Sequence, residues 1–442
     1  MRDYLRPLPG RPVLRLRAGF PCRWSVRTRD GRGWCPPDTV PARDRDGRPY
    51  FHGDDVVLPV PHEPVTVRAA RGPEYADVET TLLPGLGETL VELTPPRRYD
   101  AGARGWYGGD LHVPLNRPPG WVAAAQHGED LNVINVPPGD GETLERWSGR
   151  DLPWSDGTHV ARVDLVHEVL GLGSWPLSGV ALRELHRRGT LVTYANACDG
   201  PAETADQLMS DGDPGFDARL AVVDAALGLV DGFPSPLGSP RAYRRLIGAG
   251  NRVAAMGGGS RRFGPIGRER TYARVDGRLT AGAYAEAVRQ GRTFVTTGPF
   301  LELEVAGRGP GDTLDLAPGA TVPVTVRVLG DGAERVRLLT ADGVLASGTP
   351  TGRAGGPSAL TADLSVVWPT YVVAVVEGGG RVLAHSSPVY LDVCHRRVAR
   401  EEDVTFCLRW LDLLEKQIRD RVTEDDLEVL EEARRVYLAR QR

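Results

Sequence analysis

The pattern of strand-like and helix-like segments changes twice along the 442 residues of this chain. Between about residues 101 and 300, short apolar runs alternate with amphipathic segments of helical period, whereas on either side strand-like runs follow one another directly. Alternating strands and helices are typical of a parallel sheet or a β/α barrel, because each crossover helix packs on the sheet that it joins. The centre of the chain, residues 101–300, is therefore predicted to be α/β.

The two flanking regions are predicted to be all-β. In residues 1–100, strand-like runs are separated by turn residues at the spacing of a small β domain. The runs are 56–60, 65–68, 79–83 and 89–93. Residues 301–393 repeat this pattern, and we expect a β-sandwich there.

The last region, residues 394–442, is predicted to form a helical hairpin. Apolar residues recur at three- and four-residue spacing from Val404 to Ile418, and Thr423 stands where it can cap a second helix. This apolar stripe either packs on the body of the protein or joins two copies of the chain in a homo-oligomer.

Composition and charge exclude several classes of protein. A net charge of −4 and a pI near 6.2 give no electrostatic basis for binding nucleic acid or an anionic membrane surface. No run approaches the roughly 18 apolar residues that cross a bilayer, and the N-terminus lacks the continuous apolar core of a signal peptide. The five cysteines are scattered without a C-x-x-C pair, so neither a zinc knuckle nor a disulfide framework is expected. We therefore expect a cytoplasmic protein.

The segment G-W-Y-G-G-D-L-H-V-P (105–114) is predicted to be the first strand of the central region. It would carry Asp110 and His112 to the carboxyl end of the strand, where the small-molecule sites of α/β barrels lie. Together with Asn196, at the end of a later strand, these are the predicted catalytic residues. A metal-binding strand would present His at positions i and i+2, on one face, but Pro114 occupies the second position.

Six motifs occur in order along the chain. They are R-G-P-E-Y (71–75), G-W-Y-G-G-D-L-H (105–112), E-D-L-N-V (129–133), R-T-Y (270–272), G-R-T-F-V-T-T-G-P (291–299) and A-H-S-S-P-V-Y (384–390). Together they resemble the CehA/McbA group, carbaryl-hydrolase-like metalloenzymes of the PHP (polymerase and histidinol phosphatase) superfamily, from about residue 65 to the end. The resemblance implies a PHP-type distorted β/α barrel between β domains. It also implies a cluster of divalent metals, such as Zn, Mn or Fe, that activates water to hydrolyse esters, carbamates or phosphoesters.

The metal ligands that the resemblance implies are largely missing. Pro114 and Asn196 replace two histidines, and residues 256–260 carry no carboxylate where the family has an aspartate. His112 remains, with Glu129 or Asp130, whereas a catalytic metal takes about three protein ligands. We therefore predict a degenerate site without a cofactor, a pseudoenzyme. The alternative is a reduced metal site built from His112, Glu129 and another histidine of the region: His127, His159, His167 or His186.

A glycine-rich segment followed by arginines replaces the missing aspartate. Glycines let a ligand approach the main chain closely, and arginines bind carboxylate or phosphate through two parallel hydrogen bonds. The predicted substrate-binding residues are Gly258, Gly259, Arg261, Arg262 and, from the R-T-Y motif, Arg270. A surface loop with solvated arginines is the alternative.

Three functions are compatible with these observations. The first is the binding of an anionic small molecule without the metal-dependent hydrolysis of the family. The second is a metal-dependent hydrolase of ester, carbamate or phosphoester bonds with a reduced or relocated metal site. In the third, a β domain binds carbohydrate or another protein and the barrel is a spacer.

Overall fold

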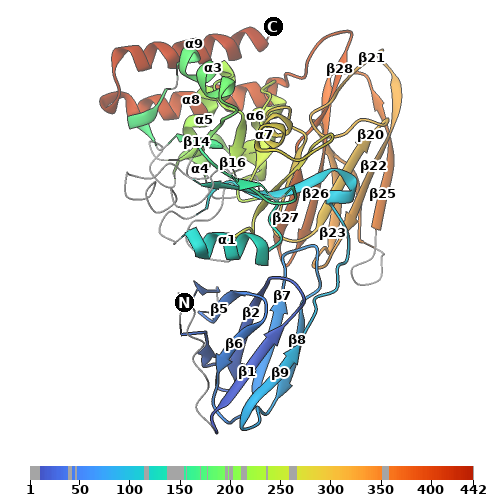
Figure 1. Ribbon diagram of the computed structural model, residues 1–442. Coiled ribbons are helices and arrows are strands. Elements are labelled where there is room, and N and C mark those ends of the chain that lie inside the picture. The colour runs from blue at the N-terminus through green and yellow to red at the C-terminus, as the bar shows by residue number, and fades with distance from the viewer. Residues whose placement is uncertain are drawn as a thin grey trace.

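The computed structural model describes residues 10–37, 42–44, 47–113, 119–136, 154–155, 157–169, 171–176, 178–194, 198, 203–210, 217–234, 237–257, 266–350 and 358–441. This part of the chain is a mixed α/β structure rich in strands, as the sequence pattern predicts. The N-terminal strands occupy one end of the molecule, and the two C-terminal helices lie at the other (Figure 1). No described helix combines the length and the apolar content that crossing a bilayer requires.

The N-terminal region folds as two packed sheets. The strands of the first are, in order, β6 (Val56–Pro59), β1 (Pro12–Arg17) and β9 (Gly87–Glu92). Those of the second are β4 (Ala42–Arg43), β5 (Pro49–Gly53), β2 (Cys22–Thr28), β7 (Val65–Ala70) and β8 (Val78–Leu82), with β3 (Gly33–Trp34) beside β2. Alternate side chains of β2 are buried, and Trp24 and Val26 share one core with Leu14 and Leu58 of the first sheet. The four predicted strands are confirmed as β6, β7, β8 and β9.

The central region contains three sets of parallel strands. The first set is β10 (Trp106–Asp110), β11 (Val133–Val136) and β13 (Val160–Val163), with β12 (Trp154–Ser155) antiparallel to β13. The other sets are β14 (Val166–Val169) with β15 (Leu191–Tyr194), and β16 (Gly232–Pro234) with β17 (Ala254–Met256). The described α-helices of this region are α1 (Pro119–Gly128), α3 (Gly179–Arg187), α4 (Ala205–Ser210), α5 (Ala221–Leu227), α6 (Pro240–Gly248) and α7 (Ala281–Arg289). Parallel strands separated by helices agree with the predicted alternation.

One sheet runs from the central region into the C-terminal strands. Next to β10, it contains β18 (Arg270–Arg274), β19 (Thr293–Thr296), β27 (Arg381–Ser386), β26 (Thr370–Gly378), β23 (Arg335–Thr340) and β24 (Gly343–Gly348), while β28 (Val389–Val393) joins β26 to β21 (Thr313–Leu316). A second sheet of β20 (Phe300–Val305), β22 (Ala320–Leu329) and β25 (Ser358–Val366) packs on it over an apolar core. Strands on both sides of residue 300 therefore share a sheet, although the sequence pattern separates two regions there.

The C-terminal helices form the predicted hairpin. They are α8 (Glu401–Ile418) and α9 (Glu424–Arg440), and Thr423 caps α9 in a capping box with Asp426. Trp410 and Tyr437 are buried with the rest of the apolar stripe, in the same core as residues of α4, α5 and α6. The stripe therefore packs on the body of the same chain.

Candidate functional site

Asp110 ties the end of β10 to the segment that precedes β18. Its Oδ1 accepts a hydrogen bond from the main-chain N–H of His112 at 2.9 Å, and its Oδ2 accepts one from the N–H of Gly267 at 2.7 Å. The carboxylate is buried. Asp110 therefore lies at the strand end, as predicted, and fixes two main-chain amides there.

His112 is buried beside Asp110 and presents one ring nitrogen without a partner. Its Nδ1 is hydrogen-bonded to Oε1 of Glu168 on β14. Its Nε2 is buried and has no hydrogen-bond partner among the described residues. A carboxylate on Nδ1 fixes the tautomer and orientation of the ring, which is the arrangement found in general bases and in histidines that bind metals through Nε2.

Glu168 is a site residue that the sequence analysis missed. It lies within β14, a short strand whose end residues Val166 and Val169 are buried. An acidic residue inside a short apolar strand is the signal that could have indicated it, because a buried carboxylate needs a partner. Neighbouring side chains on a strand point to opposite faces, so His167 is directed away from His112. Burial lowers the pKa of His167 despite the nearby Asp164 and Glu168 carboxylates.

Glu129 does not contact His112. It follows α1, and its Oε1 accepts hydrogen bonds at 2.9 Å from both Arg23 and His52 of the N-terminal sheet. Burial acts to raise the pKa of Glu129, but Arg23, His52 and Arg270 outweigh it and hold the pKa below its ordinary value. Glu129 therefore joins two regions of the protein. Within the described ranges, no three His, Cys, Asp or Glu side chains are grouped as metal ligands.

Arg270 holds the main chain around Glu129. It is almost fully buried, and its guanidinium donates to the carbonyl oxygens of Gly267 (2.6 Å), Asp130 (3.2 Å) and Glu129 (2.5 Å). Gly72 packs against the same group with a φ of +66°, and a Cβ there would lie 2.3 Å from the Glu129 oxygen. The close approach and the positive φ both require glycine in the R-G-P-E-Y motif.

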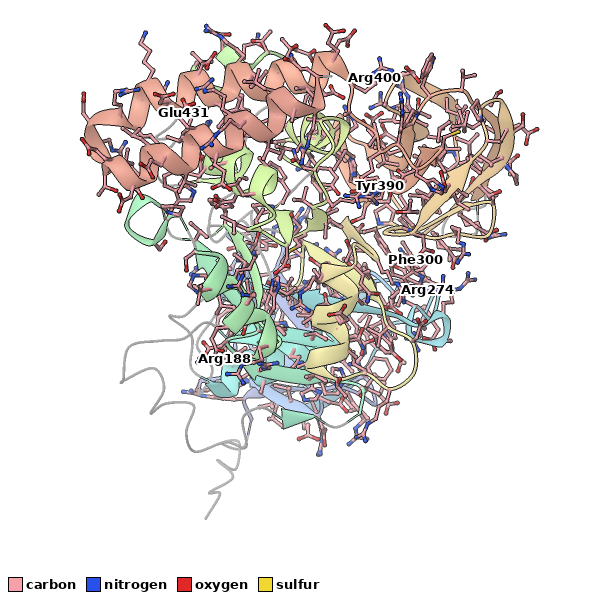
Figure 2. All side chains as sticks on the ribbon, turned by 90° about the horizontal axis from the view of Figure 1, so that it is seen from above. Arg188, Arg274, Phe300, Tyr390, Arg400 and Glu431 are labelled. Atoms are coloured by element: carbon pink, nitrogen blue, oxygen red, sulfur yellow. The ribbon has the colours of Figure 1, made fainter. Side chains whose placement is uncertain are left out.

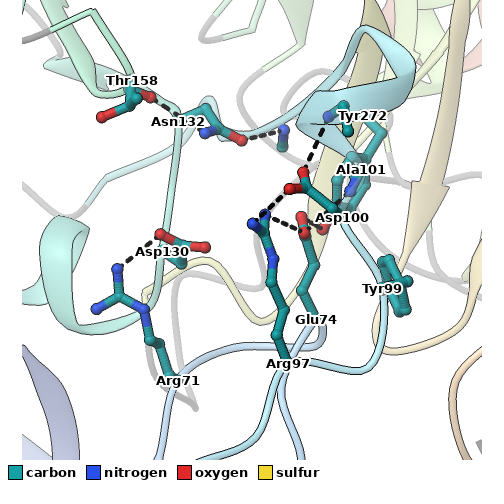
Figure 3. Close-up of polar contacts among 12 residues, drawn as sticks. Arg71, Glu74, Arg97, Tyr99, Asp100, Ala101, Asp130, Asn132, Thr158 and Tyr272 are labelled. Atoms are coloured by element: carbon teal, nitrogen blue, oxygen red, sulfur yellow. Dashed lines mark hydrogen bonds and ion pairs between the residues drawn. The ribbon is translucent and has the colours of Figure 1, made fainter. Parts of the chain in front are cut away.

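The other charged residues of this motif also contact the central region (Figure 3). Arg71 donates to Oδ1 of Asp130 at 2.8 Å. Burial opposes ionisation of Asp130, but His159 and Arg71 outweigh it and lower the pKa of Asp130 to about 2. Buried Glu74 accepts hydrogen bonds from Arg97, the Tyr272 hydroxyl and the main chain of Ala101. The motif therefore anchors the N-terminal sheets to the centre of the molecule.

Two of the alternative histidine ligands lie together. The rings of His127 and His159 are tilted against each other with centroids 4.4 Å apart, and His159 lies 3.6 Å from Asp130. The Nε2 of His186 is hydrogen-bonded to Asp231 at 3.0 Å. Five of the predicted residues lie outside the described part of the chain: Asn196, Gly258, Gly259, Arg261 and Arg262.

A cleft of about 570 Å³ lies between the N-terminal sheets and the central region. Its described lining includes seven arginines and four carboxylates, an excess of three positive charges. The arginines are Arg23, Arg27, Arg48, Arg68, Arg98, Arg268 and Arg270, and the acids are Asp44, Asp77, Glu129 and Asp331. Tyr50 and Tyr75 add aromatic surface. Gly267, whose N–H donates to Asp110, lines the same cleft. One hydrogen bond therefore connects the end of β10 to the cleft wall.

No protein-family model and no curated protein matches this chain. The solved structures that match it do so only with low TM-scores. The sulfur carrier protein SoxY from Chlorobium limicola f thiosulfatophilum is 20% identical over 21% of this chain and 77% of that one, with a TM-score of 0.17. A beta-glucosidase from Listeria innocua is 18% identical over 21% and 16% of the two chains, with a TM-score of 0.15. A lytic polysaccharide monooxygenase from Jonesia denitrificans is 13% identical over 35% and 96%, with a TM-score of 0.16. TM-scores this low establish no common fold, so these names have no bearing on function.

Proposed function

We propose that this protein binds an anionic small molecule without the metal-dependent hydrolysis of the CehA/McbA group. The binding site is the cleft between the N-terminal sheets and the central region, which we call the interdomain cleft. The excess of arginine in the cleft lining is the observation that carries this proposal. The chain as a whole has a net charge of −4, so the positive cleft is a local feature. A concave site with clustered guanidinium groups attracts and orients carboxylates or phosphates.

Two arginines of the cleft are suited to ligand contact because their side chains remain partly exposed. Arg27 lies 3.8 Å from Glu79, and Arg68 pairs with Asp77 near the surface. Exposed pairs of this kind contribute little to stability, so a ligand anion can compete for the guanidinium groups. Arg23 and Arg270, in contrast, hold Glu129 and the main chain around it.

We expect the Arg27→Gln, Arg68→Gln double variant to bind anionic ligands about 10-fold more weakly or worse, since charge-assisted hydrogen bonds contribute roughly 1.5–3 kcal/mol. Isothermal titration calorimetry with phosphate, pyrophosphate, a sugar phosphate and a dicarboxylate measures this change. The control is the Arg15→Gln, Arg17→Gln double variant, which also removes two positive charges, from arginines that pair with Asp55 on the other sheet. Equal binding by the double variant and the wild type would contradict the proposal, as would the absence of binding by every anion.

The central region is proposed to be a divergent PHP-type barrel with a degenerate metal site. The parallel strand sets and the position of His112 after β10 are compatible with this assignment. The described residues fit a multi-metal cluster poorly. His112 can offer its Nε2 as a ligand, but Glu129 is already paired with Arg23 and His52. About three ligands are needed for one catalytic metal.

The second candidate function is a metal-dependent hydrolase with a reduced site. The unpartnered Nε2 of His112, oriented through Nδ1 by Glu168, is the observation that favours it. Such a nitrogen can bind a metal ion that polarises a substrate carbonyl or lowers the pKa of water.

Metal content distinguishes the two functions. We expect protein purified without chelators to contain less than one equivalent of Zn, Mn or Fe by plasma mass spectrometry. We also expect the midpoint of thermal unfolding to be the same before and after EDTA, because the described residues lack a complete ligand set. One or more tightly bound equivalents that disappear in His112→Ala would instead support the hydrolase.

A further inference from the structure

A second pocket, which shares no residue with the cleft, has arginines of α6 and β23 and the N-cap residue of α8 in its wall. It has a volume of about 370 Å³ and lies where α6, β23 and the start of α8 meet. Its described arginines are Arg241, Arg244, Arg245, Arg337 and Arg400, and its carboxylates are Asp342, Glu402 and Asp403. Figure 2 shows Arg400 at the start of α8, on the side of the C-terminal strands.

Three of these arginines lie on one face of α6, because residues at i, i+3 and i+4 are neighbours on a helix. Like charges at this spacing destabilise a helix unless anions face them. Arg241 is paired with Glu203 and Arg245 with Asp403. Arg244, between them, has no ion pair or hydrogen bond to any residue of the described structure.

Arg244 is partly buried and surrounded by like charge. Burial lowers the pKa of its guanidinium, and the neighbouring guanidinium groups of Arg337, Arg241 and Arg245 lower it further. A buried cation without a counter-ion is costly, which is why such groups are normally paired.

Two further hydrogen-bond donors of the pocket residues lack acceptors. Arg337 pairs with Glu377 through its terminal nitrogen, but its Nε is buried without a partner among the described residues. The hydroxyl of buried Tyr371 makes no hydrogen bond to the same part of the chain. The carboxylates Asp342 and Glu402 are 70% and 76% exposed, and the third, buried Asp403, is already paired with Arg245. The five arginines therefore outnumber the carboxylates of the pocket.

We propose that this pocket is a second anion site, in which Arg244 and Tyr371 bind a phosphate or carboxylate group of a small molecule. An oxyanion supplies several acceptor atoms at once and compensates the charge of Arg244. A volume of about 370 Å³ exceeds by far the roughly 30 Å³ share of one water in the liquid, so a small phosphorylated or carboxylated molecule fits. The site is independent of the interdomain cleft, which shares none of its residues.

Thermal unfolding of the full chain with inorganic phosphate or citrate tests the proposal, with sodium chloride at equal ionic strength as the reference. We expect phosphate or citrate to raise the unfolding midpoint more than chloride does, because a ligand of the folded state stabilises it. Stabilisation by phosphate indicates a phosphate group as the ligand, and stabilisation by citrate alone indicates carboxylates.

In Arg244→Gln we expect the affinity for the stabilising anion to fall about 10-fold or more, since a charge-assisted pair is lost. Arg409→Gln is the matched control, because Arg409 of α8 forms an exposed pair with Asp206 of α4 and does not line the pocket. Tyr371→Phe, which keeps the ring, should weaken binding less, and it provides a second test if Arg244→Gln does not fold.

Three outcomes would overturn the proposal. One is equal stabilisation by chloride and by both oxyanions in the wild type. Another is unchanged affinity in both Arg244→Gln and Tyr371→Phe. The third is loss of the stabilisation in the Arg27→Gln, Arg68→Gln variant, which would assign the anion to the interdomain cleft instead.

Discussion

Replacing Arg270 with Met is expected to lower the free energy of unfolding by about 3–4 kcal/mol. The side chain is 1% exposed, and its guanidinium satisfies the carbonyl oxygens of Gly267, Asp130 and Glu129. Met retains much of the apolar stem but leaves three acceptors unsatisfied, each costing roughly 1–3 kcal/mol. Relief of the burial of a charge offsets part of this loss.

Urea unfolding followed by circular dichroism measures the effect of this change. The matched control is Arg274→Met on the same strand, β18, where the side chain is exposed and has no described ion pair. Surface substitutions of this kind change stability by no more than about 0.5 kcal/mol. A loss below about 1 kcal/mol in Arg270→Met, or a loss equal to that of the control, would show that these three hydrogen bonds of Arg270 do not stabilise the fold.

Asp224→Asn is expected to stabilise the protein at pH 8 by about 2–4 kcal/mol. Asp224 on α5 is 1% exposed and accepts hydrogen bonds from Trp175 Nε1 and the Tyr194 hydroxyl. Burial raises its pKa from 3.8 to about 7, although these two hydrogen bonds act to lower it. Each pKa unit corresponds to roughly 1.4 kcal/mol, so the charged form costs at most about 4 kcal/mol. Asn has no charge, and it keeps an acceptor oxygen for Trp175 Nε1, while its NH2 group can donate to the Tyr194 hydroxyl, which can accept.

The sign of this effect depends on pH. Below pH 3.8 the carboxyl is protonated in the folded and unfolded states, and it has no differential effect. Between pH 3.8 and about 7 the folded state binds more protons than the unfolded state, so the wild type loses stability as pH rises and then levels off. The stability gained by Asp224→Asn should therefore be near zero at pH 4 and largest above pH 7.

Chemical unfolding at several pH values between 4 and 8 checks this prediction. Asp276→Asn, at a side chain that is 76% exposed and paired with Arg292, controls for removal of a surface charge and should show no such trend. If the difference in stability between Asp224→Asn and the wild type is the same at pH 4 and at pH 8, then Asp224 is ionised in the folded protein at no cost.

The contacts around Arg270 matter for the proposed function because they form one wall of the cleft. Glu129, Gly72 and Arg270 line it, and the same residues join the N-terminal sheets to the central region. A wall held by buried hydrogen bonds loses little conformational entropy when a ligand binds. Arg27 and Arg68, which are partly exposed, can then contact the ligand.

The sequence predicted the site only in part. Asp110 and His112 lie at the end of β10, as the alternation of 105–114 indicated. Glu168 was missed because its partner, His112, is 56 residues away in the chain, and no local pattern connects them. Glu129 was considered as a metal ligand, and local sequence carries no information on Arg23 and His52, which face it from another sheet.

Local pattern by itself determined the strands of the flanks, the alternation of the centre and the capped helical hairpin, because hydrophobic period and cap residues act over a few positions. Only the tertiary structure showed that β18 and β19 connect strands from both sides of residue 300 in one sheet, since strand order depends on pairing between distant segments. The same holds for the charges. Arg270 supports the main chain, whereas Arg244 has no counter-ion among the described residues, and this difference depends on which distant groups folding brings to each arginine.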